Sequence, residues 1–200
     1  MLFEKYEVNN KVLEIFHDDN PVSPRSWDNL GTIVAWHRNY NLSEEDYNEC
    51  RDFLEDKTYQ YYESDEGIEN ASDQRLMDLF EKDNIILPVY MYEHSGIALS
   101  TTSFSCPWDS GQVGYIYVSK ERIRSEYGVK RITKKVLEKV EHILKSEIEI
   151  YSDYIDGSVY GYVLKDDKGE EVDSCWGFYG YDFKNNGMMD YLPNEFEQVL

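Results

Sequence analysis

The strands and helices predicted for this chain fall in blocks along the sequence, and this order constrains the fold more than any other feature. Three runs rich in Ile, Val, Tyr and Thr follow one another at 85–92, 97–104 and 112–118, and a hairpin is predicted over 159–180. Earlier segments are predicted as a strand over 12–16 and as a strand or short buried helix over 30–37. Because blocks of one element type favour α+β over α/β architecture, we predict an α+β fold with a mostly antiparallel sheet.

One long amphipathic helix is predicted in the second half of the chain. Apolar residues repeat at helical spacing from Val136 to Ile155, after a capping Thr133 and before Gly157. Two or three shorter helices are predicted at 44–57, after Ser72 and over 119–127. No Pro-, Gly- or Ser-rich linker separates these elements, so we expect residues 1–200 to form a single domain.

The charge of the chain limits the partners that it can bind. It has 40 acidic and 20 basic residues, a formal net charge of −20. Such a surplus argues against direct binding of nucleic acid or of an anionic membrane over a broad face, and favours a basic protein partner or mere solubility. The N-terminus does not resemble a signal peptide, and no run approaches the ~20 apolar residues of a membrane span. We therefore expect a cytoplasmic protein with no membrane association.

The acidic charge is densest in an expected helical segment at about 43–83, which holds 15 acids and 4 bases. With Ser43 as the N-cap of a helix over 44–57, six carboxylates would share one face across an arc of ~140° and a length of ~20 Å. About six phosphates of one DNA strand occupy that length, so this face has the charge density of a nucleic-acid mimic. The alternative is an ordinary solvated face. The predicted binding residues are Glu44, Glu45, Glu49, Asp52, Glu55 and Asp56, flanked by Asp65, Glu66 and Glu69.

A second candidate site combines a thiol, an imidazole and a carboxylate in the middle of the chain. Cys106 would act as nucleophile, His94 as its base and Asp109 as the group that orients the imidazole. Pro107 argues against this scheme, because proline lacks the backbone N–H that often serves an oxyanion hole. The alternative is that Cys106 is a small buried apolar residue in a turn.

No cofactor and no metal are predicted. The acidic residues and histidines show no diagnostic ligand spacing, and neither a P-loop nor a G-x-G-x-x-G motif is present. Residues 119–145 reverse the general charge, with 9 bases and 4 acids. This basic segment would hold an anionic ligand, pair with the acidic segment in a homodimer, or form a solvated face with internal ion pairs.

Three motifs give the chain a resemblance to a known family. WDNLGTIVAWH, HSGIALSTTSFSCPWDSGQVGYIYV and DSCWGFYG resemble a family of small proteins found mostly in bacteriophage and prophage genomes, over roughly 22–40 and 84–182. The resemblance does not extend to the acidic segment at 43–83. It implies a phage context but no particular activity, and by analogy a modulator of host machinery, including host defence.

Together these observations predict a non-enzymatic protein that binds a host nucleic-acid-handling protein through its acidic surface and inhibits or regulates it. Two alternatives belong to other functional classes. One is a small hydrolase or metal-dependent enzyme built on the His94, Cys106 and Asp109 region. The other is a structural or assembly component, which would present a large apolar interface.

Overall fold

A computed structural model describes residues 1–62 and 65–200, and side chains at all of these positions except 65 and 66. The α+β prediction is confirmed, since the described residues form helices and two four-stranded antiparallel sheets. The chain divides into two compact units where one domain was expected. Unit 1 contains Met1–Trp27 and Ile150–Leu200, and unit 2 contains Asp28–Glu149. Because one boundary falls inside a continuous helix, no change of composition marks it.

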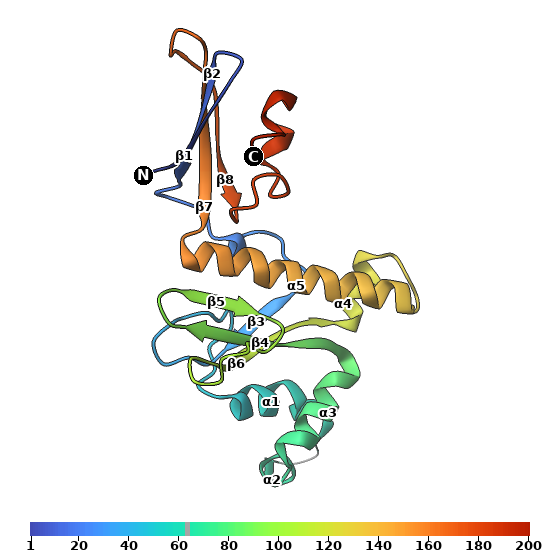
Figure 1. The fold of residues 1–200 in the computed structure, drawn as a ribbon. Coiled ribbons are helices and arrows are strands. Elements are labelled where there is room, and N and C mark those ends of the chain that lie inside the picture. The colour runs from blue at the N-terminus through green and yellow to red at the C-terminus, as the bar shows by residue number, and fades with distance from the viewer. Residues whose placement is uncertain (63–64) are drawn as a thin grey trace. The chain divides into compact units, whose positions relative to one another are not determined.

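Unit 2 is built on a sheet of strand order β3-β6-β4-β5 (Figure 1). Its strands are β3 (Thr32–Ala35), β4 (Asn84–Glu93), β5 (Ile97–Ser100) and β6 (Ser110–Ser119). The expected run at 97–104 therefore ends as a strand at Ser100. Pro88 pairs with Tyr115 of β6, next to a register shift at Val89 and Tyr90, and β5 pairs only with the residues of β4 that follow. Proline is tolerated there because that part of β4 has a strand on one side only.

Helices lie on both faces of this sheet in Figure 1. On one face are α1 (Cys50–Thr58), α2 (Asp65–Glu69) and α3 (Asp73–Asp83), whose buried Phe53, Leu76 and Phe80 pack in one cluster with Val34 of β3. On the other face is α5 (Lys134–Asp156), which contributes its buried apolar residues up to Glu149 to this unit. The prediction of one long helix after a capping Thr133 is confirmed, because the Thr133 hydroxyl accepts from Val136 N at 3.4 Å.

The first short helix begins later than its sequence predicts. The interval 44–57 was expected to be helical, but α1 begins at Cys50 and the Ser43 hydroxyl is not its cap. Instead that hydroxyl accepts from Ala35 N at 3.1 Å, and the Glu44 carboxylate accepts from Ile33 N at 2.6 Å. These bonds satisfy donors on the side of β3 that no other described strand covers. Ser43 and Glu44, which the sequence predicts as the start of a helix, therefore bind backbone N–H groups at the edge of β3 instead. The predicted shorter helices after Ser72 and over 119–127 are present as α3 and α4 (Lys120–Glu126).

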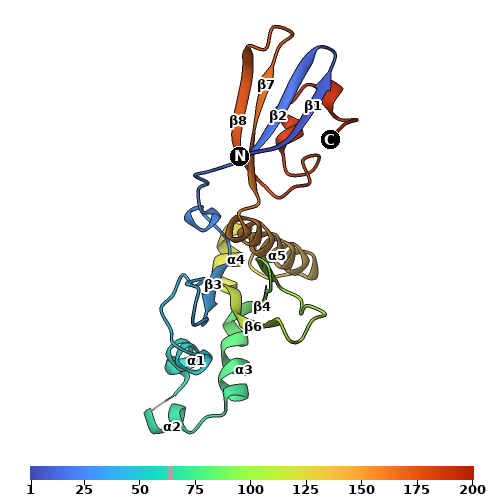
Figure 2. The ribbon, with the colours of Figure 1, turned by 60° about the vertical axis from the view of Figure 1, so that its left-hand side comes forward.

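Unit 1 is a second antiparallel sheet, of order β1-β2-β7-β8, whose four strands are seen side by side in Figure 2. They are β1 (Leu2–Val8), β2 (Lys11–His17), β7 (Val159–Lys165) and β8 (Glu171–Tyr179). Asn9 and Asn10 both have positive φ in the two-residue turn between β1 and β2, a conformation that asparagine accepts readily. Residues 183–196, which include short 3₁₀ turns at Met188–Asp190 and Asn194–Phe196, contribute Phe183, Met188 and Phe196 to the core of the sheet.

Candidate functional site

The shorter α1 divides the predicted row of carboxylates into two groups. Asp52, Glu55 and Asp56 lie on α1, and Glu49 is the residue before its first turn. Glu44 and Glu45 lie on the preceding irregular segment. The prediction that six carboxylates occupy one continuous helix face is therefore wrong, because residues 43 and 44 are held at the edge of β3.

Four of the six carboxylates have partners within unit 2. The Glu44 carboxylate is bound to Ile33 N, as described above, and Glu55 pairs with Arg51 Nε at 2.7 Å. Asp56 accepts from the Tyr47 hydroxyl at 2.5 Å. Glu45 pairs with Lys57 Nζ at 2.7 Å and accepts from the Tyr117 hydroxyl at 3.0 Å. These four side chains contribute to the structure of the unit before they contribute to any interface.

Glu45, Lys57 and Tyr117 form a partly buried group in which the Glu45 carboxylate interacts with both other side chains. The side chains of Glu45 and Lys57 are each 26% exposed. Burial and then the nearby Glu45 charge raise the pKa of Tyr117 from 10.0 to about 12. Burial lowers the pKa of Lys57, but the hydrogen bond and charge of Glu45 outweigh this effect and raise it overall.

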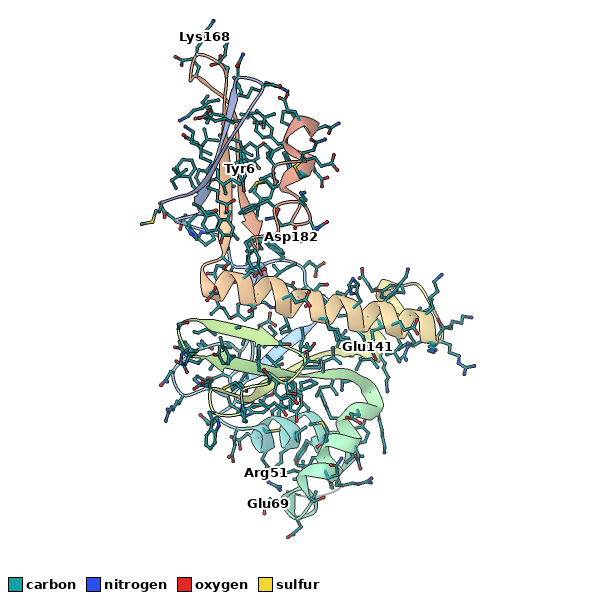
Figure 3. The ribbon with its side chains drawn as sticks, in the orientation of Figure 1. Tyr6, Arg51, Glu69, Glu141, Lys168 and Asp182 are labelled. Atoms are coloured by element: carbon teal, nitrogen blue, oxygen red, sulfur yellow. The ribbon has the colours of Figure 1, made fainter. Side chains whose placement is uncertain are left out.

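Five of the predicted acids are exposed, and three of them have carboxylates without a partner among the described residues. Glu49, Asp52 and Glu69 are exposed, and no hydrogen bond or ion pair of their carboxylates is found among the described residues. The side chains of Asp65 and Glu66 lie outside the described residues. Figure 3 labels Glu69 close to Arg51, whose guanidinium donates to the backbone carbonyls of Glu69 and Ala71 and pairs with Asp73 at 2.6 Å. Arg51 thus links α1 to the start of α3 while the Glu69 carboxylate stays exposed.

A polar cavity of about 880 Å³ lies between the end of β3 and the start of α1. It is lined by residues 35–41, which begin in the last three residues of the first family-like motif, and by residues 43–48, which include Glu44, Glu45 and Asp46. The rings of His37 and Tyr40 stack at 5.2 Å on its wall, and the Tyr40 hydroxyl donates to Glu93 at 2.7 Å. Sequence reasoning treated the motif and the acids as separate features and missed this cavity. Their closeness in sequence was the available signal.

The structure brings His94, Cys106 and Asp109 together, as the second candidate site requires. The end of β4 and the start of β6 meet at one end of the sheet, where Glu93 N donates to Asp109 O at 2.9 Å. The Cys106 thiol donates to Asp109 Oδ2 at 3.4 Å, and His94 Nδ1 lies 3.6 Å from the same oxygen. Asp109 is therefore the centre of the cluster, and it touches both other groups.

This order of contacts does not match the predicted catalytic scheme. A cysteine nucleophile needs its base at the sulfur, but here the thiol donates to the Asp109 carboxylate, and the imidazole approaches that same carboxylate oxygen. The His94 side chain is also 66% exposed, so the site does not exclude water. The neighbouring Trp108 is 92% exposed, which is unusual for a large aromatic side chain. Among the described residues, no group of three or more His, Cys, Asp or Glu side chains is arranged to hold a metal ion.

Comparison of the chain with known proteins gave no matching family model, no matching curated protein and no matching solved structure. Among the described residues, no helix is both long enough and apolar enough to cross a membrane.

Proposed function

We propose that this chain is a binding protein that uses the acidic segment of unit 2, residues 43–83, to engage a basic, nucleic-acid-handling protein. In this proposal the chain acts in the cytoplasm of a bacterial host, in the phage context that the three motifs suggest, and it inhibits or modulates its partner. Its chemistry is non-covalent. The contact residues are the carboxylates that the unit does not use internally, Glu49, Asp52 and Glu69.

The main support is the unequal pairing of charges in the acidic segment. Two of its four cations, Arg51 and Lys57, are held by carboxylates of the same unit. The segment nevertheless has 15 acids, so most of its negative charge is not balanced within the segment. Exposed charges of one sign raise the rate of encounter with a partner of the opposite sign and orient the two surfaces.

The exposed Trp108 gives the proposal an apolar element. Tryptophan is among the residues that contribute most to protein interfaces, because its ring buries a large area at a low cost in conformational entropy. In this chain Trp108 lies in the connection before β6 and is the residue before Asp109. We infer that it adds to the interface as an aromatic contact whose strength depends little on salt.

A pull-down with mass spectrometry at low and high salt tests the proposal. The chain should retain a DNA- or RNA-binding protein at low salt and lose most of it at high salt, because salt screens exposed charges. Nucleic acid added to the lysate should compete with the chain for that protein. The double variant Glu49→Gln/Asp52→Asn should bind the purified partner roughly threefold to tenfold more weakly, since each exposed charge contributes up to about 1 kcal/mol.

The matched control is Asp167→Asn/Glu170→Gln. These two exposed acids lie in unit 1, and the control changes the net charge by the same amount. Equal weakening by both double variants would show a general charge effect and would argue against a surface on the acidic segment. Capture that withstands high salt and the Glu49/Asp52 changes would contradict the proposal.

A further inference from the structure

A second cavity in unit 2 has the opposite charge to the rest of the molecule. It has a volume of about 470 Å³ and lies where α4 is followed by the start of α5. We call it the basic cavity. Its lining includes five cationic side chains from three consecutive pieces of chain: Lys120 and Arg124 of α4, Lys130 and Arg131 of the connection, and Lys134 of α5.

Few of these cations have an acidic partner. Among the described residues, Arg124, Lys130 and Arg131 form no ion pair, although the chain has twice as many acids as bases. Lys134 pairs with Glu138 at 3.7 Å, and both side chains of this pair are exposed. Lys120 has a structural role, since its ammonium donates to the carbonyls of Glu81 and Lys82 at the end of α3. Arg124, Lys130, Arg131 and Lys134 are exposed, as the prediction of a solvated basic face requires, but the internal ion pairs of that prediction do not extend to Arg124, Lys130 and Arg131 among the described residues.

The position of the cations at the start of α5 has an energetic cost. The first turn of α5 contains no acid, and Lys134 and Lys135 are its first two residues. The N-terminus of a helix already has a partial positive charge, so cations at that position are unfavourable. A bound anion would offset this repulsion and would accept hydrogen bonds from the side chains around it. Figure 3 shows nitrogen-tipped side chains projecting from this end of α5.

The size and the walls of the basic cavity define the class of anion. Ligand cavities for small molecules typically have volumes of roughly 300–1,000 Å³, so this one suits a ligand of nucleotide size. Ile85, Ile132 and Leu137 add apolar wall that an inorganic ion would not need. A long polyanion is disfavoured because it would extend beyond the cavity over a molecule of net charge −20.

We infer that the basic cavity binds a small ligand bearing a chain of phosphates, with Arg124, Lys130 and Arg131 contacting the phosphates. The shared chemistry of such ligands is a short polyphosphate, either free or attached to a nucleoside. Arginine and lysine together suit this group, since guanidinium binds phosphate oxygens in pairs and ammonium acts as a compact charge. This site is separate from the surface proposed above, and it does not depend on that proposal.

Isothermal titration calorimetry of the full chain at low ionic strength tests the inference. The probes are tripolyphosphate, ATP, adenosine and a single-stranded oligonucleotide. Tripolyphosphate and ATP should bind and adenosine should not. Tighter binding of ATP than of tripolyphosphate would assign the ligand as a nucleotide, and equal binding would assign the phosphate chain alone as the recognised group.

The variant Lys130→Gln/Arg131→Gln should weaken the binding of tripolyphosphate by about tenfold, since it removes two charge-assisted contacts. The control Lys168→Gln/Lys184→Gln changes the net charge equally at two exposed positions of unit 1 and should leave binding unchanged. The inference is overturned if neither phosphate probe binds, or if both double variants weaken binding equally. Binding of the oligonucleotide alone, lost in the Lys130/Arg131 variant, would also overturn it.

Discussion

The acidic segment and the basic cavity lie in the same unit, have opposite charges and differ in how those charges are balanced. In the acidic segment the cations Arg51 and Lys57 are held by carboxylates, and the excess acids Glu49 and Asp52 are exposed. Around the basic cavity the cations Arg124, Lys130 and Arg131 are without ion pairs among the described residues. Net charge alone would have indicated only the first region. The comparison teaches that local pairing identifies a charged surface available to a ligand better than the total charge does.

The largest expected effect is the loss of folding stability at high pH that arises from the group around Glu45, which contains Tyr117 and Lys57. The raised pKa of Tyr117 means that the folded state holds the phenol proton more tightly than the unfolded chain does. The resulting stabilisation is complete below about pH 10 and is lost as the pH rises to about 12, up to a limit of about 2–3 kcal/mol. Tyr117→Phe should remove this part of the alkaline loss.

Urea unfolding at a series of alkaline pH values measures this loss. The control is Tyr181→Phe, which also removes one phenol hydroxyl, but from a side chain that is 74% exposed. An identical alkaline loss in the wild type and in Tyr117→Phe would show that the group around Glu45 is not as well matched as its contacts imply.

A smaller effect separates the two kinds of acid within the acidic segment. Glu45→Gln removes the charge that pairs with Lys57 and accepts from Tyr117, so the free energy of unfolding should fall by about 1 kcal/mol. Glu49→Gln removes an exposed carboxylate and should change it by less than about 0.5 kcal/mol. Thermal or urea unfolding of the two variants gives the comparison directly. Equal losses would contradict the division between internally used and exposed acids.

The smallest effect concerns the unmatched cations. In the absence of phosphate ligands, Lys130→Gln/Arg131→Gln should raise the free energy of unfolding by a few tenths of a kcal/mol, because it relieves repulsion near the positive end of α5. The gain should disappear at high salt. A loss of stability at low salt would mean that these cations have favourable interactions within the unit.

The parts of the fold that could be predicted from the sequence are those fixed by local pattern. The apolar repeat from Val136 to Ile155 and the Ile-, Val- and Tyr-rich runs at 85–92 and 112–118 correctly gave α5, β4 and β6. The start of α1 was mispredicted because Ser43 and the acids after it have two uses, as a helix cap or as acceptors for a strand edge. The choice between them depends on β3, which a local pattern does not contain.

The candidate sites were predictable to different degrees. The separation of His94 from Cys106 allows the two to meet without requiring it, and the central place of Asp109 could not be predicted, because it depends on the pairing of β4 with β6. The cavity beside Tyr40 was missed because its two walls, 35–41 and 43–48, were assigned to different features. The sequence of residues 119–145 allowed an anionic ligand as one of three alternatives. The structure favours that alternative because no described carboxylate forms an ion pair with Arg124, Lys130 or Arg131.

The arrangement of the chain in two units has a consequence for the order of synthesis. Unit 2 is inserted between two pieces of unit 1, and Leu13 of β2 pairs with Leu164 of β7. On the ribosome, the β1–β2 hairpin therefore emerges first but lacks its neighbouring strand until more than the whole of unit 2 has been translated. A pairing so distant in sequence forms slowly, while the contacts of unit 2 become available earlier. Vectorial synthesis thus favours completion of unit 2 before the sheet of unit 1 has closed.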